Sequence, residues 1–234
     1  MTRLTLLILM SVMVSTGAAQ PWLEFSENGF DFGYCPQQSA VAHTFWIRST
    51  GTDSLDILKI TPGCGCTKAP LDKEIIPPGD SARLEIIFST RRYDGPVTKN
   101  PRVLANDGLP DHRLEISTVV IADADSAWPL VVEPMDLNLA VGAGKVRTEK
   151  PFTITNVSER DCEIELVAHP GDLLKVFLPG KIKAGETAGA KIQLVGPPPP
   201  EGFVKSFTFE VESGLTVRYS IPVQCPSSDS LSKE

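Results

Sequence analysis

A pattern of short hydrophobic segments occurs twice in this chain, and it limits the possible fold more than any other feature. The segment 30–33 (FDFG) corresponds to 137–140 (LNLA), and Phe45 corresponds to Phe152; the numbering differs by 107 in both cases (137 − 30 and 152 − 45). Ile76 has its counterpart in Ile182, at an offset of 106 (182 − 76). A repeat of this length indicates tandem domains rather than a solenoid.

Each copy consists of segments that alternate between apolar and polar residues, separated by turn residues such as those of 77–80 (PPGD) and 106–108 (NDG). Such segments predict short strands of an antiparallel β-sandwich. The 20 prolines disfavour a helical architecture, because proline removes a helix donor. We therefore expect an all-β chain with two immunoglobulin-like sandwiches at residues 21–123 and 128–225, followed by a polar tail at 226–234.

The same alternation predicts the side chains of the two cores. The predicted core of the first sandwich is Phe45, Ile47, Leu55, Ile57, Leu84, Ile86 and Phe88. The predicted core of the second sandwich is Phe152, Ile154, Ile164, Leu166, Ile192 and Leu194.

The segment 1–19 has the pattern of a cleaved secretory signal. Arg3 is followed by an apolar stretch at 4–14 and by small residues at 17–19 (GAA), and no cysteine follows the stretch to accept a lipid. Later segments are too short or too polar to span a membrane. We therefore expect a protein that is secreted or periplasmic and is not a lipoprotein.

Charge and motifs exclude several functions. The formal charge of −7 argues against nucleic-acid binding, which usually needs a basic face. The nucleophile elbow Gly-x-Ser-x-Gly, a phosphate-binding glycine loop and a His-Glu-x-x-His helix are all absent from the sequence. Of the three histidines, His112 is expected in a solvated loop and His169 in a turn. We expect a protein that is not an enzyme and has no obligatory cofactor.

The chain has five cysteines: Cys35, Cys64, Cys66, Cys162 and Cys225. An odd number outside the cytoplasm leaves at least one thiol free, metal-bound or paired with another chain. The strand count places Cys162 and Cys225 at opposite ends of the second sandwich, farther apart than the ~5.5 Å between Cα atoms that a disulfide needs. We predict that both are unpaired.

The remaining cysteines define the candidate site. Counting strands up and down the first sandwich places Cys35, Cys64 and Cys66 in loops at one end, with His43 opening a strand there. Three thiols and an imidazole suit Cu(I) or Zn(II). The alternatives are a disulfide within this set, including a Cys64–Cys66 link, or inert buried thiols.

A redox-active thiol pair is the weakest alternative for the same residues. The usual Cys-x-x-Cys motif on a βαβ unit is missing, and Lys68 is the only basic residue close to the pair in sequence. The second copy of the repeat has Gly142, Lys150, Gly171 and Leu173 at the four corresponding positions. The predicted site is therefore local and is not required for the fold.

Several motifs of the first copy occur in the order typical of a known family. These motifs are FDFG at 30–33, HTF at 43–45, STG at 49–51, GCGCT at 63–67, IPPG at 76–79 and YDG at 93–95. With them the first domain resembles the bacterial domain of unknown function 1573, which implies an immunoglobulin-like sandwich of the abnormal-spindle and Hydin type. The second domain matches as a degenerate copy, and Cys35 departs from the small polar residue expected at its position.

The resemblance implies a fold and no activity. We therefore expect an exported binding or structural module that contacts a protein partner in the cell envelope through edge strands or end loops. Handling of copper or zinc at Cys35, His43, Cys64 and Cys66 is the alternative function.

Overall fold

The computed structural model describes residues 19–141 and 145–227. Residues 1–18 of the predicted signal and 228–234 of the predicted tail lie outside the described residues. No helix in the described ranges is long and apolar enough to cross a membrane.

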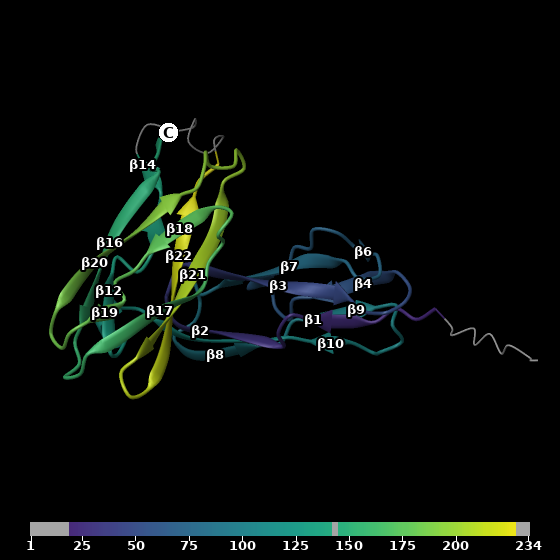
Figure 1. Cartoon of the computed structure of the whole chain (residues 1–234), viewed down its shortest axis with the longest axis horizontal. Coiled ribbons are helices and arrows are strands. Elements are labelled where there is room, and N and C mark those ends of the chain that lie inside the picture. The colour runs from purple at the N-terminus through teal and green to yellow at the C-terminus, as the bar shows by residue number, and fades with distance from the viewer. Residues whose placement is uncertain (1–18, 142–144, 228–234) are drawn as a thin grey trace, which may run out of the picture.

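The first sandwich packs two four-stranded sheets against each other, in the right half of Figure 1. One sheet has the order β1 (Leu23–Phe25), β3 (Ala40–Ser49), β7 (Ser81–Ser89), β5 (Thr67–Lys68). The other has the order β10 (His112–Arg113), β9 (Arg102–Ala105), β4 (Leu55–Thr61), β6 (Ile75–Ile76). The pairings within both sheets are antiparallel, as the alternating segments predicted.

The second sandwich repeats the first of these sheets. Its order is β12 (Leu130–Glu133), β16 (Glu149–Asn156), β20 (Thr187–Leu194), β18 (Leu174–Phe177). A short 3-10 turn at Ala124–Ser126 precedes β12, and a small hairpin of β14 (Ala140–Val141) and β15 (Lys145–Val146) precedes β16.

The repeat is visible in the strand registers. Leu23 pairs with Ser49 in the first copy and Leu130 with Asn156 in the second, and both residue numbers rise by 107 (130 − 23 and 156 − 49). The pair Leu55 with Ile76 likewise corresponds to Cys162 with Ile182. Equivalent residues of the two copies therefore form equivalent pairs.

One sheet runs through both halves of the molecule. Its order is β19 (Lys181–Ile182), β17 (Cys162–Ala168), β21 (Phe203–Glu212), β22 (Thr216–Cys225), β2 (Gly29–Pro36), β11 (Glu115–Ile121), β8 (Gly95–Lys99), and β13 (Leu137–Asn138) also pairs with β22. The pairs β2–β22, β2–β11 and β13–β22 are parallel. The all-β immunoglobulin-like fold is as predicted, but the two sandwiches share a sheet that the strand count did not anticipate.

The shared sheet bends where β2 meets β22. These strands pair only at Tyr34 and Tyr219, because the first sandwich extends sideways from the long strands β21 and β22 (Figure 1). Gly33 has a φ of 63°, and a Cβ there would lie 1.9 Å from the carbonyl oxygen of Arg218. Only glycine allows the two backbones to approach this closely.

The core prediction is confirmed with one exception. All the predicted core side chains of the first sandwich are at most 8% exposed, and so are those of the second except Leu166, which is half-buried. The buried residues form two clusters, one in each half of the molecule. Burying each large side chain stabilises the fold by ~1.5–3 kcal/mol.

Polar contacts tie the two halves together beside the shared sheet. The Ser206 hydroxyl accepts a hydrogen bond from the Ala42 backbone N–H at 2.9 Å and donates one to the Ala42 carbonyl at 2.7 Å. Lys205 and Glu85 form an ion pair across the same junction, with both side chains mostly buried. These buried polar groups of the junction are therefore satisfied, as a fixed interface requires.

Candidate functional site

The Gly-Cys-Gly-Cys-Thr segment forms a tight loop between β4 and β5. Cys64 and Cys66 are joined by a disulfide, with 5.2 Å between their Cα atoms. Gly63 has a φ of 90°, and a Cβ on Gly65 would meet no heavy atom within 4 Å. The loop therefore turns through a glycine and has an open side, and both cysteines are half-buried rather than enclosed.

This disulfide contributes little as a cross-link. Its two cysteines are separated by a single glycine, so it closes a very short loop. By loop entropy such a link stabilises the fold by about 1.6 kcal/mol, against about 3 kcal/mol for a loop of about 15 residues. Stapling the sandwich is therefore a poor explanation for the pair.

Two hydroxyl groups lie beside the sulfur atoms of Cys64 and Cys66. The hydroxyl of the buried Thr67 lies 3.3 Å from Cys64 Sγ and 3.8 Å from Cys66 Sγ. The Tyr93 hydroxyl donates a hydrogen bond to Cys66 Sγ at 3.2 Å. Cys66 thus has two hydroxyl neighbours and Cys64 has one.

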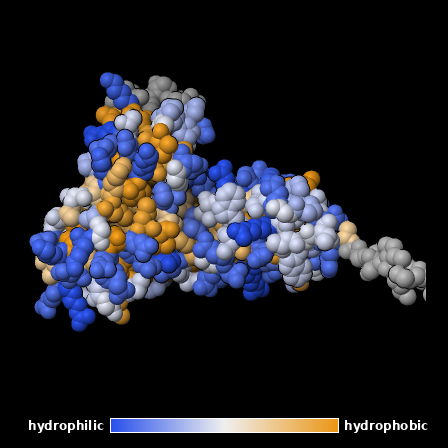
Figure 2. Space-filling view, viewed as in Figure 1, coloured by the Kyte–Doolittle hydropathy of each residue, from blue (hydrophilic) through white to orange (hydrophobic). Residues whose placement is uncertain are grey.

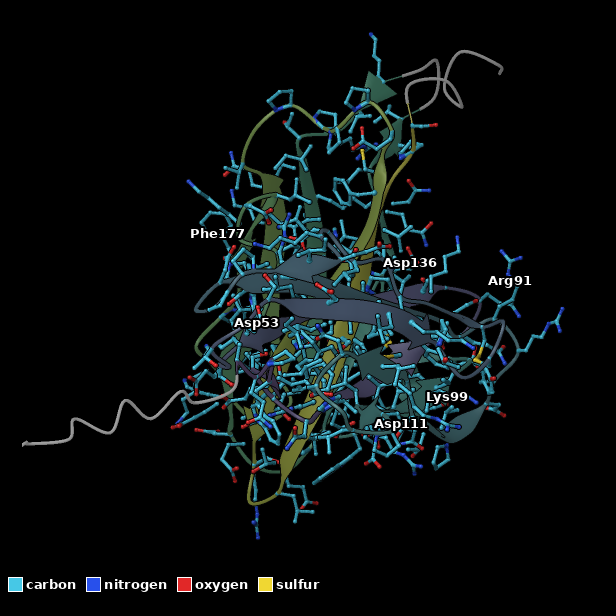
Figure 3. All side chains as sticks on the ribbon, turned by 90° about the vertical axis from the view of Figure 1, so that its right-hand side faces the viewer. Asp53, Arg91, Lys99, Asp111, Asp136 and Phe177 are labelled. Carbon is cyan, nitrogen blue, oxygen red and sulfur yellow. A yellow bond between two sulfur atoms is a disulfide. The ribbon has the colours of Figure 1, made fainter. Side chains whose placement is uncertain are left out.

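Tyr93 is held in place by contacts to its backbone and to its ring. The Gln37 side chain donates to the Tyr93 carbonyl oxygen at 2.7 Å, and the Phe88 ring centroid lies 5.3 Å from that of Tyr93. The ammonium nitrogen of Lys99 on β8 lies 4.6 Å from the Tyr93 ring centroid, a cation–π distance. Figure 3 shows Arg91 and Lys99 on the side of the molecule that carries the disulfide.

We predicted Cys35 in a loop, but it lies within β2. It is fully buried and free, and burial raises the pKa of its thiol to about 12, although the neighbouring Thr118 and Ser220 side chains oppose the shift. The strand count failed because the first strand extends through Pro36 to join the shared sheet.

His43 also lies apart from the cysteine loop. Its ring stacks on Phe30 with 3.6 Å between centroids, and Nε2 lies 2.8 Å from the Glu27 carboxylate. Burial lowers the pKa of His43, although Glu27 opposes the shift. The imidazole therefore belongs to an aromatic cluster at the core.

The four predicted ligands do not form a common site. Among the described residues, no three His, Cys, Asp or Glu side chains lie close enough to hold a metal ion. The prediction that Cys35, His43, Cys64 and Cys66 converge is wrong, because β2 buries Cys35 and Phe30 covers His43. The Cys64–Cys66 link, which we kept as an alternative, is the pairing observed.

A second candidate site is an apolar groove on the outer face of the second sandwich. It has a volume of about 600 Å³, and its apolar lining includes Pro134, Pro151, Phe177, Leu178, Pro179 and Gly189. Phe177 is 43% exposed, and the Lys191 ammonium lies 5.2 Å from its ring centroid. We call this surface the Phe177 groove.

The Phe177 groove lies beside an open sheet edge. Strand β18, which ends at Phe177, pairs with β20 on one side and with no other described strand. Hydrophobic residues gather on the second sandwich in Figure 2, while the visible face of the first is mostly hydrophilic. Figure 3 places Phe177 on the side opposite to Arg91 and Lys99, so the groove is remote from the cysteine loop.

Sequence patterns did not point to this groove. The one available signal was Phe177 itself, an aromatic residue at an outward position of a short alternating segment that a proline follows. Tyr93 and Lys99 were missed as neighbours of Cys66 because a long stretch of chain, including all of β7, separates them from it.

Fold and site together define an all-β protein of immunoglobulin-like sandwiches. The sequence model of the family described as "Protein of unknown function (DUF1573)" matches residues 23–120. The first sandwich is therefore a domain of that family, as its motifs had suggested. The match includes the Gly-Cys-Gly-Cys-Thr loop, Tyr93 and Lys99.

Solved structures resemble the chain only distantly, and no curated protein matches its sequence. A protein of unknown function from Porphyromonas gingivalis W83 is 12% identical with a TM-score of 0.35, covering 87% of this chain and 99% of its own. A PapD-like domain of human CEP192 is 11% identical with a TM-score of 0.34, covering 52% of this chain and 99% of its own. These similarities assign no function.

Proposed function

We propose that this chain is an exported module that binds a protein of the cell envelope through the Phe177 groove and the adjacent edge of β18. The observation that carries the proposal is the combination of an unpaired strand edge, among the described strands, with an apolar groove beside it. The leader-like pattern at residues 1–19 supports export.

The open edge of β18 supplies backbone hydrogen bonds. A partner segment that adds to this edge as a strand would pair with its N–H and C=O groups. Alternate side chains of such a segment face the same side of the sheet as Phe177. Main-chain pairing therefore provides affinity, and the groove provides selectivity for an apolar side chain.

The charged side chains near the groove indicate which kind of residue lies near that apolar side chain in the partner segment. Lys175 is exposed on β18 two positions before Phe177, so both side chains face outward on the same side of the strand. Lys191 lies over the Phe177 ring and pairs with Glu149 at 2.9 Å. The partner segment is accordingly extended, with an acidic residue two positions from an apolar one.

The test uses photo-crosslinking in the native envelope fraction. A photoreactive amino acid at position 175 is combined with Phe177→Asp, or with Leu215→Asp as the matched control, because Leu215 is 66% exposed in the distant β21–β22 turn. We expect the crosslinked adduct to fall at least tenfold in Phe177→Asp and to persist in Leu215→Asp. Equal adduct in both variants, or none in either, would refute the proposal.

A further inference from the structure

The Cys64–Cys66 loop has the features of a reacting group rather than of a structural link. Both cysteines are half-buried in a loop with an open side at Gly65, whereas Cys35, Cys162 and Cys225 are buried and free. The loop lies on the opposite side of the molecule from the Phe177 groove, so its role is independent of the proposed binding function.

The groups around the sulfurs favour the reduced state. A disulfide sulfur is a weak hydrogen-bond acceptor, whereas a thiolate is a strong one, so a bond donated by a hydroxyl strengthens when the disulfide opens. Tyr93 is positioned to donate to Cys66, and Thr67 can donate to either sulfur. These contacts therefore stabilise the reduced pair with one sulfur as a thiolate more than they stabilise the disulfide.

Positive charge adds to the same effect. Lys99 lies over the Tyr93 ring, and Lys68, Arg91 and Arg92 are exposed on the segments next to the loop, with Asp94 as the acidic residue of that turn. Cations near a developing thiolate favour it. The sequence suggested only Lys68, and the fold brings the other cations to the same end of the sandwich.

We propose that Cys64–Cys66 is a redox-active disulfide that exchanges with dithiols of extracytoplasmic polypeptides. A substrate thiolate attacks Cys64 Sγ, the Cys64–Cys66 bond breaks, and Cys66 leaves as a thiolate that Tyr93 and Thr67 stabilise. The second substrate thiol, once deprotonated, attacks the substrate sulfur of the mixed disulfide and releases Cys64. The substrate is oxidised to a disulfide, both its protons end on Cys64 and Cys66 or in solvent, and this chain is reduced by two electrons.

The direction of attack follows from the neighbours of each sulfur. The sulfur that leaves most readily is the one whose thiolate is better stabilised. Cys66 has the Tyr93 hydroxyl at 3.2 Å in addition to Thr67, and Cys64 has Thr67 alone. The incoming thiol therefore becomes attached to Cys64.

The test equilibrates the purified mature chain with buffers of reduced and oxidised glutathione, followed by acid quenching, alkylation and peptide mass analysis. The variants are Tyr93→Phe and, as a matched control, Tyr34→Phe, which removes a tyrosine hydroxyl from β2. We expect the reduced-to-oxidised ratio to fall about tenfold in Tyr93→Phe, which is about 30 mV for a two-electron couple. The control ratio should not change, and trapped glutathione should be on Cys64.

Three results of this equilibration would overturn the proposal. They are a disulfide that stays oxidised under a large excess of reduced glutathione, equal ratios in Tyr93→Phe and Tyr34→Phe, and glutathione attached to Cys66. A mature chain isolated with one bound metal ion, whose loop cysteines react only after chelation, would also overturn it in favour of metal binding.

Discussion

At the scale of single residues, burial determines which polar side chains contribute to the stability of the fold. His112 was expected in a solvated loop, but its side chain is 13% exposed, and Nε2 lies 2.6 Å from a carboxylate oxygen of the fully buried Asp107 side chain. The Phe25 ring covers it edge-on. No sequence pattern indicated this pair, because the segment from Asp107 to His112 must fold back on itself to form it.

Replacing His112 by Ala should destabilise the protein by about 2–3 kcal/mol, because the buried Asp107 carboxylate loses its side-chain partner. Urea unfolding at neutral pH measures the change. His169→Ala is the control, because His169 lies just beyond the end of β17, and it should stay within about 0.5 kcal/mol of the parent. A loss in His112→Ala no larger than that of the control would show that the pair is not needed.

At the scale of elements, the crossing of β2 and β22 depends on a close approach of two backbones. Gly33 lets the two backbones meet, and on either side of the crossing Thr118 donates to the Gly33 carbonyl at 2.9 Å and Ser220 to the Phe32 carbonyl at 2.7 Å. These hydroxyls satisfy carbonyls at a point where the parallel pairing is a single residue pair long. The join between the strands therefore depends on one glycine and two short polar side chains.

Replacing Gly33 by Ala should cost more than about 3 kcal/mol, since the new Cβ would meet backbone as well as requiring a positive φ. Gly79→Ala is the matched control: its φ is 79°, but a Cβ there meets nothing within 4 Å. We expect a loss of about 1–2 kcal/mol in this control. Thermal unfolding of both variants compares them, and similar losses would mean that the close approach to Arg218 carries no cost.

At the scale of the whole molecule, the two sandwiches form one continuous body. They share a sheet, and the Ser206 and Lys205 contacts close the junction beside it. The predicted boundaries at residues 123 and 128 remain a prediction, because strands from both halves pair across them. The Phe177 groove and the cysteine loop are thereby held on opposite sides of a fixed frame.

We expect the full chain to unfold in a single cooperative transition, because unfolding either sandwich would break the shared sheet. Calorimetry and intrinsic fluorescence should give coincident midpoints. Two separated transitions in the parent protein would contradict a joined fold and would indicate independent domains.

Local patterns in the chain were enough to predict the strands, the repeat and nearly all of the core, because alternation and turn residues act over short distances and recur in the second copy. Phe45, Leu84 and Phe152 were found in this way, and so was the family of the first domain. Leu166 was the exception in the core, because a register irregularity after it disturbs the alternation.

The connection between the two sandwiches and the surroundings of the cysteines, in contrast, depend on the packing of whole sheets. The pairing of β2 with β22, the burial of Cys35 and the approach of Tyr93 and Lys99 to the cysteine loop all link residues that lie far apart in the chain or in different sandwiches. No local pattern can specify such contacts, because an alternation of apolar and polar residues is the same whichever distant strand lies beside it.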